Sequence, residues 1–213
     1  MTKSTGFVHD SIGPGLTAIQ TLGQQNNFAV DATEDSAFFS MANLSQYQCV
    51  VFLNTTGDIL SASQETSFSN YIAGGGGFVG VHAASGTERN WPWYEQLVGA
   101  YLKDHPPIQA AQLMAINNSH PSTVGLPGTF SFTDEYYNFV TDPTATVNVL
   151  LTIDETSYSG GTMGPGHPIS WFHTNLGGRA WYTNLGHRKE TFSDAFFLTH
   201  LLGGIRYSAS QTP

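Results

Sequence analysis

Charged side chains are scarce in this sequence, and cationic ones are the scarcest. Among 213 residues, 7 are Lys or Arg and 16 are Asp or Glu, which gives a formal net charge of −9. So few cations argue against a protein that binds the phosphate backbone of nucleic acids. Charged residues make up 11% of the chain, against ~25% in an average globular protein, but hydrophobic residues make up 40%. The sequence therefore has enough apolar material for a folded core.

The chain also lacks cysteine pairs and long apolar runs. Its single cysteine, Cys49, excludes an intramolecular disulfide and a cysteine-rich zinc site. No apolar run approaches the ~20 residues needed to cross a bilayer. Residues 1–30 contain no basic segment followed by a long apolar stretch, so no signal peptide is visible. We expect a cytoplasmic protein with neither a membrane nor a nucleic acid as partner.

The spacing of apolar residues predicts one α/β domain over residues 1–213. Strands and helices alternate in the first two-thirds, which is typical of a parallel sheet with right-handed crossovers. The expected strands there are 28–30, 49–53 and 78–81, and the expected helices lie around 16–22 and 61–72. Further strands, expected to extend the sheet in antiparallel fashion, are 108–116, 147–153, 169–173 and 179–183. A final helix is expected over 191–206.

Polar residues follow two of the predicted parallel strands, where ligands of such sheets bind. Asn54 to Asp58, including Thr56, follow the first, and His82 to Ser85 follow the second. The segment Gly80–Ala84 resembles a nucleophile elbow with His82 in the nucleophile's place. A histidine there predicts a general acid, a general base or a metal ligand. The alternative is a histidine that is only hydrogen-bonded at a turn.

Histidine is unusually frequent among the ionisable side chains, with 8 in the chain, one more than Lys and Arg together. No pair has the spacing of a helical zinc site, so a metal site would have to be assembled from distant segments. His9, His82 and His187 fall at predicted strand-to-loop ends and are the candidate ligands for a divalent metal. His200, in the predicted final helix, is expected to be structural.

Two clusters combine aromatic residues with polar ones. Trp93 and Tyr94 lie in a run of three aromatics in four residues, and they are either a platform for a sugar ring or part of the core. Asp134 and Glu135 precede Tyr137 in the second cluster. Neighbouring residues of a strand point to opposite faces, so one of the two carboxylates is expected to enter a site as acid, base or orienting group.

These segments resemble the ThuA-like (trehalose-utilisation) family over nearly the whole chain. The matching motifs are Lys3–Ser11, Val51–Asp58, Gly75–Ser85, Trp91–Tyr94, Leu97–Ala100, Asp134–Phe139, His167–Trp171 and Leu185–His187. The resemblance implies the class I glutamine amidotransferase-like fold, a mostly parallel flavodoxin-like sheet flanked by helices. It also implies a role in carbohydrate metabolism. Glutamine hydrolysis is not expected, because the elbow position carries His82.

The resemblance further implies partnership with sugar oxidoreductases that make 3-keto-glycosides, and we expect cleavage or isomerisation of such keto sugars. The expected catalytic residues are His82, Asp134, Glu135 and His187. The expected substrate-binding residues are His9, Asp10, Thr56, Trp93, Tyr94, Tyr137 and His167. A divalent metal is the one cofactor considered. The alternatives are a non-catalytic carbohydrate-binding or regulatory module and a metal-dependent hydrolase of another substrate.

One departure from the family concerns the first strand. Family members have a strand before the motif that begins at Lys3, and it is central in a flavodoxin-like sheet, but only Met1 and Thr2 precede Lys3 here. An unfilled position would leave two rows of backbone groups unpaired. We expect a truncated chain, a sheet that closes over the gap, or a strand supplied by a second copy in a homodimer.

Overall fold

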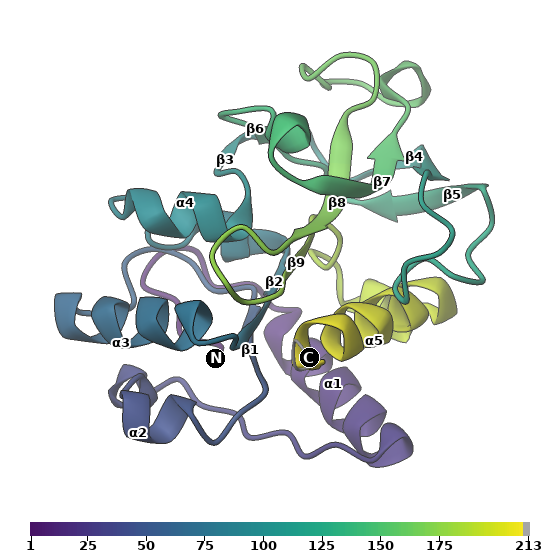
Figure 1. Cartoon of the computed structure of the whole chain (residues 1–213). Helices are drawn as coiled ribbons and strands as arrows, with labels where there is room; N and C mark the ends of the chain where they lie inside the picture. The colour runs from purple at the N-terminus through teal and green to yellow at the C-terminus, as the bar shows by residue number, and fades with distance from the viewer. Residues whose placement is uncertain (211–213) are drawn as a thin grey trace.

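The computed structural model describes residues 1–210 and has three layers, with a seven-stranded sheet between two groups of helices (Figure 1). The strand order is β1-β2-β9-β8-β7-β4-β5. These strands are β1 (Cys49–Leu53), β2 (Gly77–Val81), β4 (Gln109–Ala115), β5 (Thr129–Asp134), β7 (Asn148–Ile153), β8 (Pro168–His173) and β9 (Ala180–Thr183). A separate small sheet pairs β3 (Leu102–Asp104) with β6 (Asn138–Phe139).

The central sheet is mixed, and the change of direction falls at β9. Strands β1, β2 and β9 run parallel to one another. The pairs from β9 through β8, β7 and β4 to β5 are all antiparallel. The α/β fold with antiparallel strands in the later half of the chain is therefore confirmed. As a result, the carboxyl ends of β1, β2 and β9 meet at one edge of the sheet.

Helices cover both faces of the sheet. Helices α1 (Ile12–Asn26) and α5 (Ala195–Ala209) lie on one side, and α3 (Ala62–Ala73) and α4 (Pro92–Val98) lie on the other (Figure 1). The short elements are α2 (Met41–Leu44) and the 3₁₀ turns η1 (Ser36–Phe38), η2 (His82–Gly86), η3 (Pro143–Ala145), η4 (Glu155–Ser157) and η5 (Lys189–Ser193). Within residues 1–210, no helix combines the length and the apolar character that a membrane span requires.

Alternate residues of the parallel strands build two separate cores. Leu53, Val79 and Trp181 point toward α1 and α5, where they form one buried cluster with residues such as Ile19 and Leu201. Their chain neighbours point the other way and form the second cluster with α3 and α4; they include Phe52, Phe78 and Tyr182, which meet Phe68 and Tyr94. This is the pattern of strands that are buried on both faces. Burial on both faces fixes the register of the sheet. The register in turn sets the positions of the residues that follow the carboxyl ends of the strands.

Strand β1 is the edge strand of the sheet, and among the described residues no further strand lies beyond it. The Met1 amine donates to the carbonyl of Val51 at 2.9 Å, and the amide of Leu53 donates to the Met1 carbonyl at 3.1 Å. A groove of about 360 Å³ continues alongside β1. Residues 28–30 line its far side and form no strand, so that prediction was wrong. Met1 covers only the part of β1 around Val51 and Leu53, and a strand from a second copy stays a prediction.

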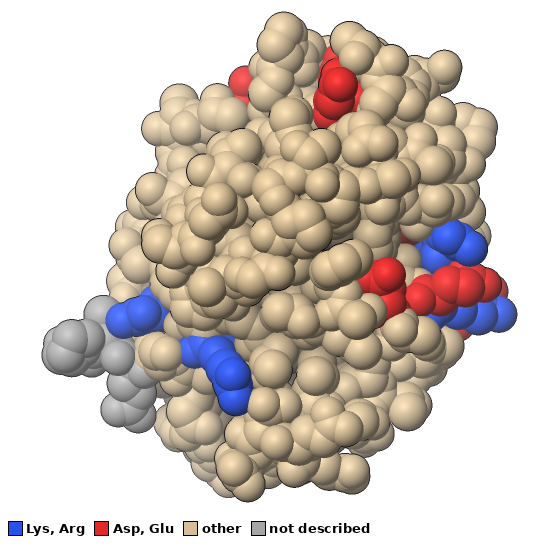
Figure 2. Space-filling model, turned by 90° about the vertical axis from the view of Figure 1, so that its right-hand side faces the viewer, with Lys and Arg blue, Asp and Glu red and all other residues tan. Residues whose placement is uncertain are grey.

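The surface reflects the low charge of the sequence. On the face shown in Figure 2, Lys, Arg, Asp and Glu form a few small, separate groups on an otherwise uncharged surface. No continuous cationic patch is visible on that face. Ion pairs are correspondingly few and partly exposed, as between Lys189 and Asp10 at 2.8 Å.

Candidate functional site

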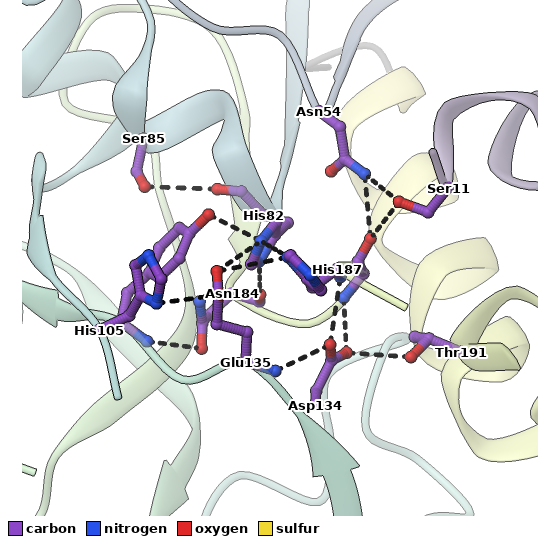
Figure 3. A network of polar contacts seen from close by, with 12 residues as sticks. Ser11, Asn54, His82, Ser85, His105, Asp134, Glu135, Asn184, His187 and Thr191 are labelled. Atoms are coloured by element: carbon purple, nitrogen blue, oxygen red, sulfur yellow. Dashed lines mark hydrogen bonds and ion pairs between the residues drawn. The ribbon is translucent and has the colours of Figure 1, made fainter. Parts of the chain in front are cut away.

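The candidate site lies at the edge where the parallel strands end (Figure 3). His82 follows β2, Asn54 follows β1, and Asn184 to His187 follow β9. From the opposite side, the end of β5 delivers Asp134 and Glu135. Segments far apart in the sequence thus meet at one point. The site owes its assembly to the sheet rather than to any local motif.

His82 is the fully buried centre of this network. Its Nδ1 lies 2.6 Å from the carbonyl oxygen of Asn184, and because a carbonyl can only accept, Nδ1 carries the proton. The unprotonated Nε2 accepts from the Tyr137 hydroxyl at 2.7 Å. Burial raises the pKa of the Tyr137 phenol well above its usual value, so the hydroxyl keeps its proton. His82 has φ 47°, a left-handed conformation that costs ~1–2 kcal/mol for a residue other than glycine.

Glu135 is the carboxylate that faces the histidines. Its Oε1 lies 3.3 Å from His187 Nδ1 and 3.5 Å from His82 Nε2, and its Oε2 lies 2.9 Å from His105 Nδ1. Burial by itself would raise the pKa of Glu135, but the hydrogen bond from His187 and the adjacent His82 ring outweigh it and hold the pKa well below its usual range. The same hydrogen bond to Glu135 raises the pKa of His187. Glu135 is therefore ionised, and His187 is the histidine next to it that favours the protonated form.

Asp134 points away from the histidine rings and holds a loop instead. Its carboxylate accepts hydrogen bonds from the amides of Gly186 at 2.8 Å and His187 at 3.2 Å, and from the Thr191 hydroxyl at 3.0 Å. The prediction that one of the two adjacent carboxylates enters the site is therefore confirmed. Asp134 was expected to be catalytic, but its oxygens are engaged with the backbone that carries His187 and with Thr191.

A second group of hydrogen bonds fixes the same loop from the side of α1. The Asn54 amide donates to Ser11 Oγ and to the Gly186 carbonyl, both at 2.9 Å, and the Ser11 hydroxyl donates to that carbonyl at 3.1 Å. Gly186 has φ 122°, and a Cβ there would lie 2.9 Å from a methyl group of Val81. Glycine is required at this turn for both reasons.

Three histidines come together beside Glu135. One potential ligand nitrogen from each of His9, His82 and His187 lies within 4.8 Å of the other two. His9 comes from the loop before α1, and its ring centroid is 5.1 Å from those of His82 and His187. Burial, followed by the neighbouring His82 and His187, lowers the pKa of His9 to about 3, so its imidazole is neutral. The expectation that distant segments bring these three histidines together is confirmed.

A cleft of about 430 Å³ opens onto this cluster. That volume falls within the ~300–1,000 Å³ typical of small-molecule sites. The residues that line the cleft are mostly polar or aromatic, and they include Phe7, His9, Thr56, Arg89, His105, Glu135, Tyr137 and His187. His82 is not among them, since it lies behind the cleft wall and contacts the residues that form it.

The structure brings some of the predicted substrate-binding residues to the cleft and leaves others out. His9, Thr56 and Tyr137 line it. Asp10 is exposed beside Lys189 and does not line it.

His167 is buried behind the cleft, where its Nε2 donates to the Tyr137 carbonyl at 2.9 Å and its Nδ1 lies 2.9 Å from Glu155. It therefore supports Tyr137 from behind.

The expected sugar platform was wrong. Tyr94 is fully buried in the core beneath α4, and its hydroxyl donates to the carbonyl of Ala84 at 2.9 Å. Trp93 stacks on Trp91, with ring centroids 4.7 Å apart, and packs against the same core. Neither ring lines the cleft, because the first turn of α4 directs them into the apolar layer between helix and sheet.

Two residues at the site were missed by the sequence reasoning. His105 reaches Glu135 from the loop after β3, and Asn184 holds His82 through its backbone carbonyl. His105 precedes two prolines and follows no periodic pattern, so nothing local marked it. Asn184 follows directly on a predicted strand, and this position at the same sheet edge is a signal that could have found it.

Comparison with known proteins agrees with the family resemblance. The model of the family described as "ThuA: Trehalose utilisation" matches residues 1–208. A protein from Bacteroides uniformis described as thua-like has a similar structure, with a TM-score of 0.82 and 26% identity over 97% of this chain and 89% of its own. Another protein described as thua-like, from Parabacteroides merdae, has a TM-score of 0.81 and 21% identity over 98% of this chain and 88% of its own.

More distant similarity concerns the fold alone. A cytoplasmic protein from Salmonella typhimurium matches with a TM-score of 0.66 and 14% identity over 91% of this chain and 87% of its own. None of the curated proteins compared with the chain matches it.

Proposed function

Because this chain belongs to the ThuA, or trehalose utilisation, family, we propose that it is an enzyme that cleaves or isomerises keto sugars or their glycosides by acid–base chemistry. Family membership suggests a carbohydrate-related role. The proposal adds a reaction type, which depends on the arrangement of Glu135, His187, Tyr137 and His82.

The convergence of His82, His187 and Glu135 is the observation that carries this proposal. A sugar-binding module needs only a cleft of the right shape, and its ionisable groups can lie anywhere. Here His82 Nε2 is 3.2 Å from His187 and 3.5 Å from Glu135. Two adjacent groups also have pKa values pushed in opposite directions, down for Glu135 and up for His187. The lowered pKa keeps Glu135 ionised and able to accept a proton, and the raised pKa keeps a proton on His187 that it can donate.

The proposed mechanism uses the acidity that a ketone gives to its neighbouring carbon. In a 3-keto-glycoside, Glu135 removes the proton from the second carbon, and the electron pair moves onto the ketone oxygen to form an enolate. When the enolate collapses, a double bond forms between the first and second carbons and the glycosidic C–O bond breaks. His187 gives its proton to the departing oxygen. Reprotonation of the enolate at another carbon would isomerise the sugar instead.

The contact between the two groups completes the cycle. Glu135 ends the reaction protonated and His187 ends it neutral, and they lie 3.3 Å apart. The proton can therefore return from the carboxyl group to the imidazole. General acid–base catalysis of this kind is worth ~10²–10⁴-fold in rate. His82 and Tyr137 act as positioning residues, because His82 contacts His187, Glu135 and the Tyr137 hydroxyl without lining the cleft.

The test is turnover of enzymatically oxidised disaccharides, such as a 3-keto-trehalose, by the purified chain. Wild type should release the free sugar or an isomer, and His82→Ala should lose turnover while keeping its fold. Asp10→Asn is the matched control, because Asp10 lies next to His9 in sequence but outside the cleft. Calorimetric binding of the keto sugar without turnover by wild type would point to a binding module, and equal turnover by His82→Ala would contradict the assignment.

A further inference from the structure

We infer that His9, His82 and His187 form a binding site for one divalent transition metal ion, of which Zn²⁺ and Co²⁺ are representative. The inference concerns metal binding alone and does not depend on the sugar substrate. It asks whether one ring nitrogen from each of the three histidines can meet on one ion.

The separation of the nitrogens fits a common ion. Zn–N bonds are ~2.1 Å long, so two nitrogens on one ion lie at most ~4.2 Å apart, and closer in a tetrahedral arrangement. His82 Nε2 and His187 Nδ1 are 3.2 Å apart, and all three nitrogens lie within 4.8 Å of one another. The widest pair, up to 4.8 Å, would have to close by about 1 Å to reach a tetrahedral arrangement. His9 comes from a loop before α1, where such a shift moves no strand.

An unpartnered nitrogen gives the second observation. His9 is only 6% exposed, yet its Nδ1 is buried with no hydrogen-bond partner among the described residues. Leaving a buried polar atom unpaired typically costs ~1–3 kcal/mol, and native proteins keep few of them. The rings of His82 and His187 both lie against His9. A metal ion at this point would take the free lone pair of His9 Nδ1, and it would replace the Tyr137 hydroxyl at His82 Nε2 and the proton that His187 Nδ1 shares with Glu135.

The surroundings resemble those of metal-binding histidines in general. Such a histidine usually donates its other ring N–H to a carbonyl or carboxylate, which fixes the tautomer and the ring. His82 does this through Nδ1, which donates to the Asn184 carbonyl at 2.6 Å, so that Nε2 faces the cluster. Glu135 lies beside two of the three rings and can serve as a fourth ligand or as a hydrogen-bond acceptor.

Imidazole nitrogens select Zn²⁺ and related transition metals over Mg²⁺ and Ca²⁺, which prefer oxygen. Three protein ligands next to an open cleft are also the arrangement of catalytic rather than structural zinc sites. When bound, the metal would supply positive charge to an oxygen of the ligand in the cleft.

The test is metal binding by the whole chain after chelator treatment. Titration with Co²⁺, followed by its visible absorption, and with Zn²⁺, followed by calorimetry, should give one equivalent per chain. His9→Ala, His82→Ala and His187→Ala should each weaken binding by at least about 100-fold. His105→Ala is the matched control, since His105 also contacts Glu135 but is outside the trio, and it should bind one equivalent.

Thermal melting separates loss of binding from loss of fold. Zn²⁺ should raise the melting temperature of wild type and of His105→Ala, because a ligand of the folded state stabilises it, and should leave that of a folded His9→Ala unchanged. Stoichiometric binding by His9→Ala equal to that of wild type, or no binding by wild type, would overturn the inference. Keto-sugar turnover is measured separately, so the metal-binding result can be interpreted even if the proposed reaction does not occur.

Discussion

The carboxylate of Asp134 accepts a hydrogen bond from the backbone amide of His187 at 3.2 Å, while the next residue, Glu135, lies 3.3 Å from the His187 ring. One pair of adjacent carboxylates thus holds both the backbone and the side chain of the same histidine. Asp134 fixes where His187 stands, and Glu135 sets its protonation.

This division predicts different outcomes for two isosteric substitutions. Glu135→Gln removes the base and the charge that favours protonated His187, so turnover should fall by ~10²–10⁴-fold. Asp134→Asn replaces one acceptor of a buried set of hydrogen bonds with a donor, and should cost about 1–3 kcal/mol of unfolding free energy. Urea unfolding and keto-sugar turnover of both variants check the prediction. Wild-type turnover by Glu135→Gln, or wild-type stability of Asp134→Asn, would contradict it.

The neighbouring tyrosines offer a matched pair for the contact with His82. The Tyr137 hydroxyl donates to His82 Nε2 at 2.7 Å, whereas the Tyr136 hydroxyl donates to the carbonyl of Phe132 at 2.7 Å. Both side chains are buried, so Tyr137→Phe and Tyr136→Phe should each lose about 0.5–1.5 kcal/mol of stability. Only Tyr137→Phe should also lower kcat and shift its pH profile. Equal effects of both variants on kcat would show that the His82 contact has no special role.

The buried histidines should make the fold lose stability in acid at pH values above those at which the carboxylates titrate. Burial lowers the pKa of His9 to about 3 and the pKa values of His120 and His200 to about 4, from an ordinary value of 6.5. Below pH 6.5 the unfolded chain therefore binds protons that the folded chain does not. Stability should be lost as the pH falls toward 4, by about 1.4 kcal/mol per pH unit for each histidine.

His200 allows the contribution of one such group to be measured. Its Nδ1 donates to the Ser122 carbonyl at 2.8 Å, and the amide of His200→Asn can keep that bond without titrating. Urea unfolding at pH 5 and pH 6 should show a pH slope smaller by about 1.4 kcal/mol per unit in the variant than in wild type. Identical slopes would mean that His200 titrates alike in the folded and unfolded chains.

Much of the site could be predicted because it is built on strand ends. The apolar runs that became β1 and β2 placed Asn54 and His82 at the same edge, and His187 followed from the end of β9. What the sequence could not provide was the direction of side chains in less regular segments. Whether Asp134 or Glu135 faced the histidines depended on the pleat of β5.

The aromatic residues show the same limit. The sequence of an aromatic run at the start of a helix does not show which side chains face the core. In α4, Tyr94 is one that does. His105 was hidden for a different reason, since the short pairing of β3 with β6 that brings it to Glu135 involves only two or three residues per strand.

The open backbone of β1 has a practical consequence for chemical labelling. Cys49, the only cysteine of the chain, begins this strand and lines the groove beside it. Burial raises the pKa of its thiol to about 12, so the reactive thiolate is scarce at neutral pH and alkylation should be slow. Any extended segment that paired with β1 would cover the same sulfur. The rate at which this single thiol is alkylated thus measures whether the edge of the sheet is occupied, with no mutation or attached reporter.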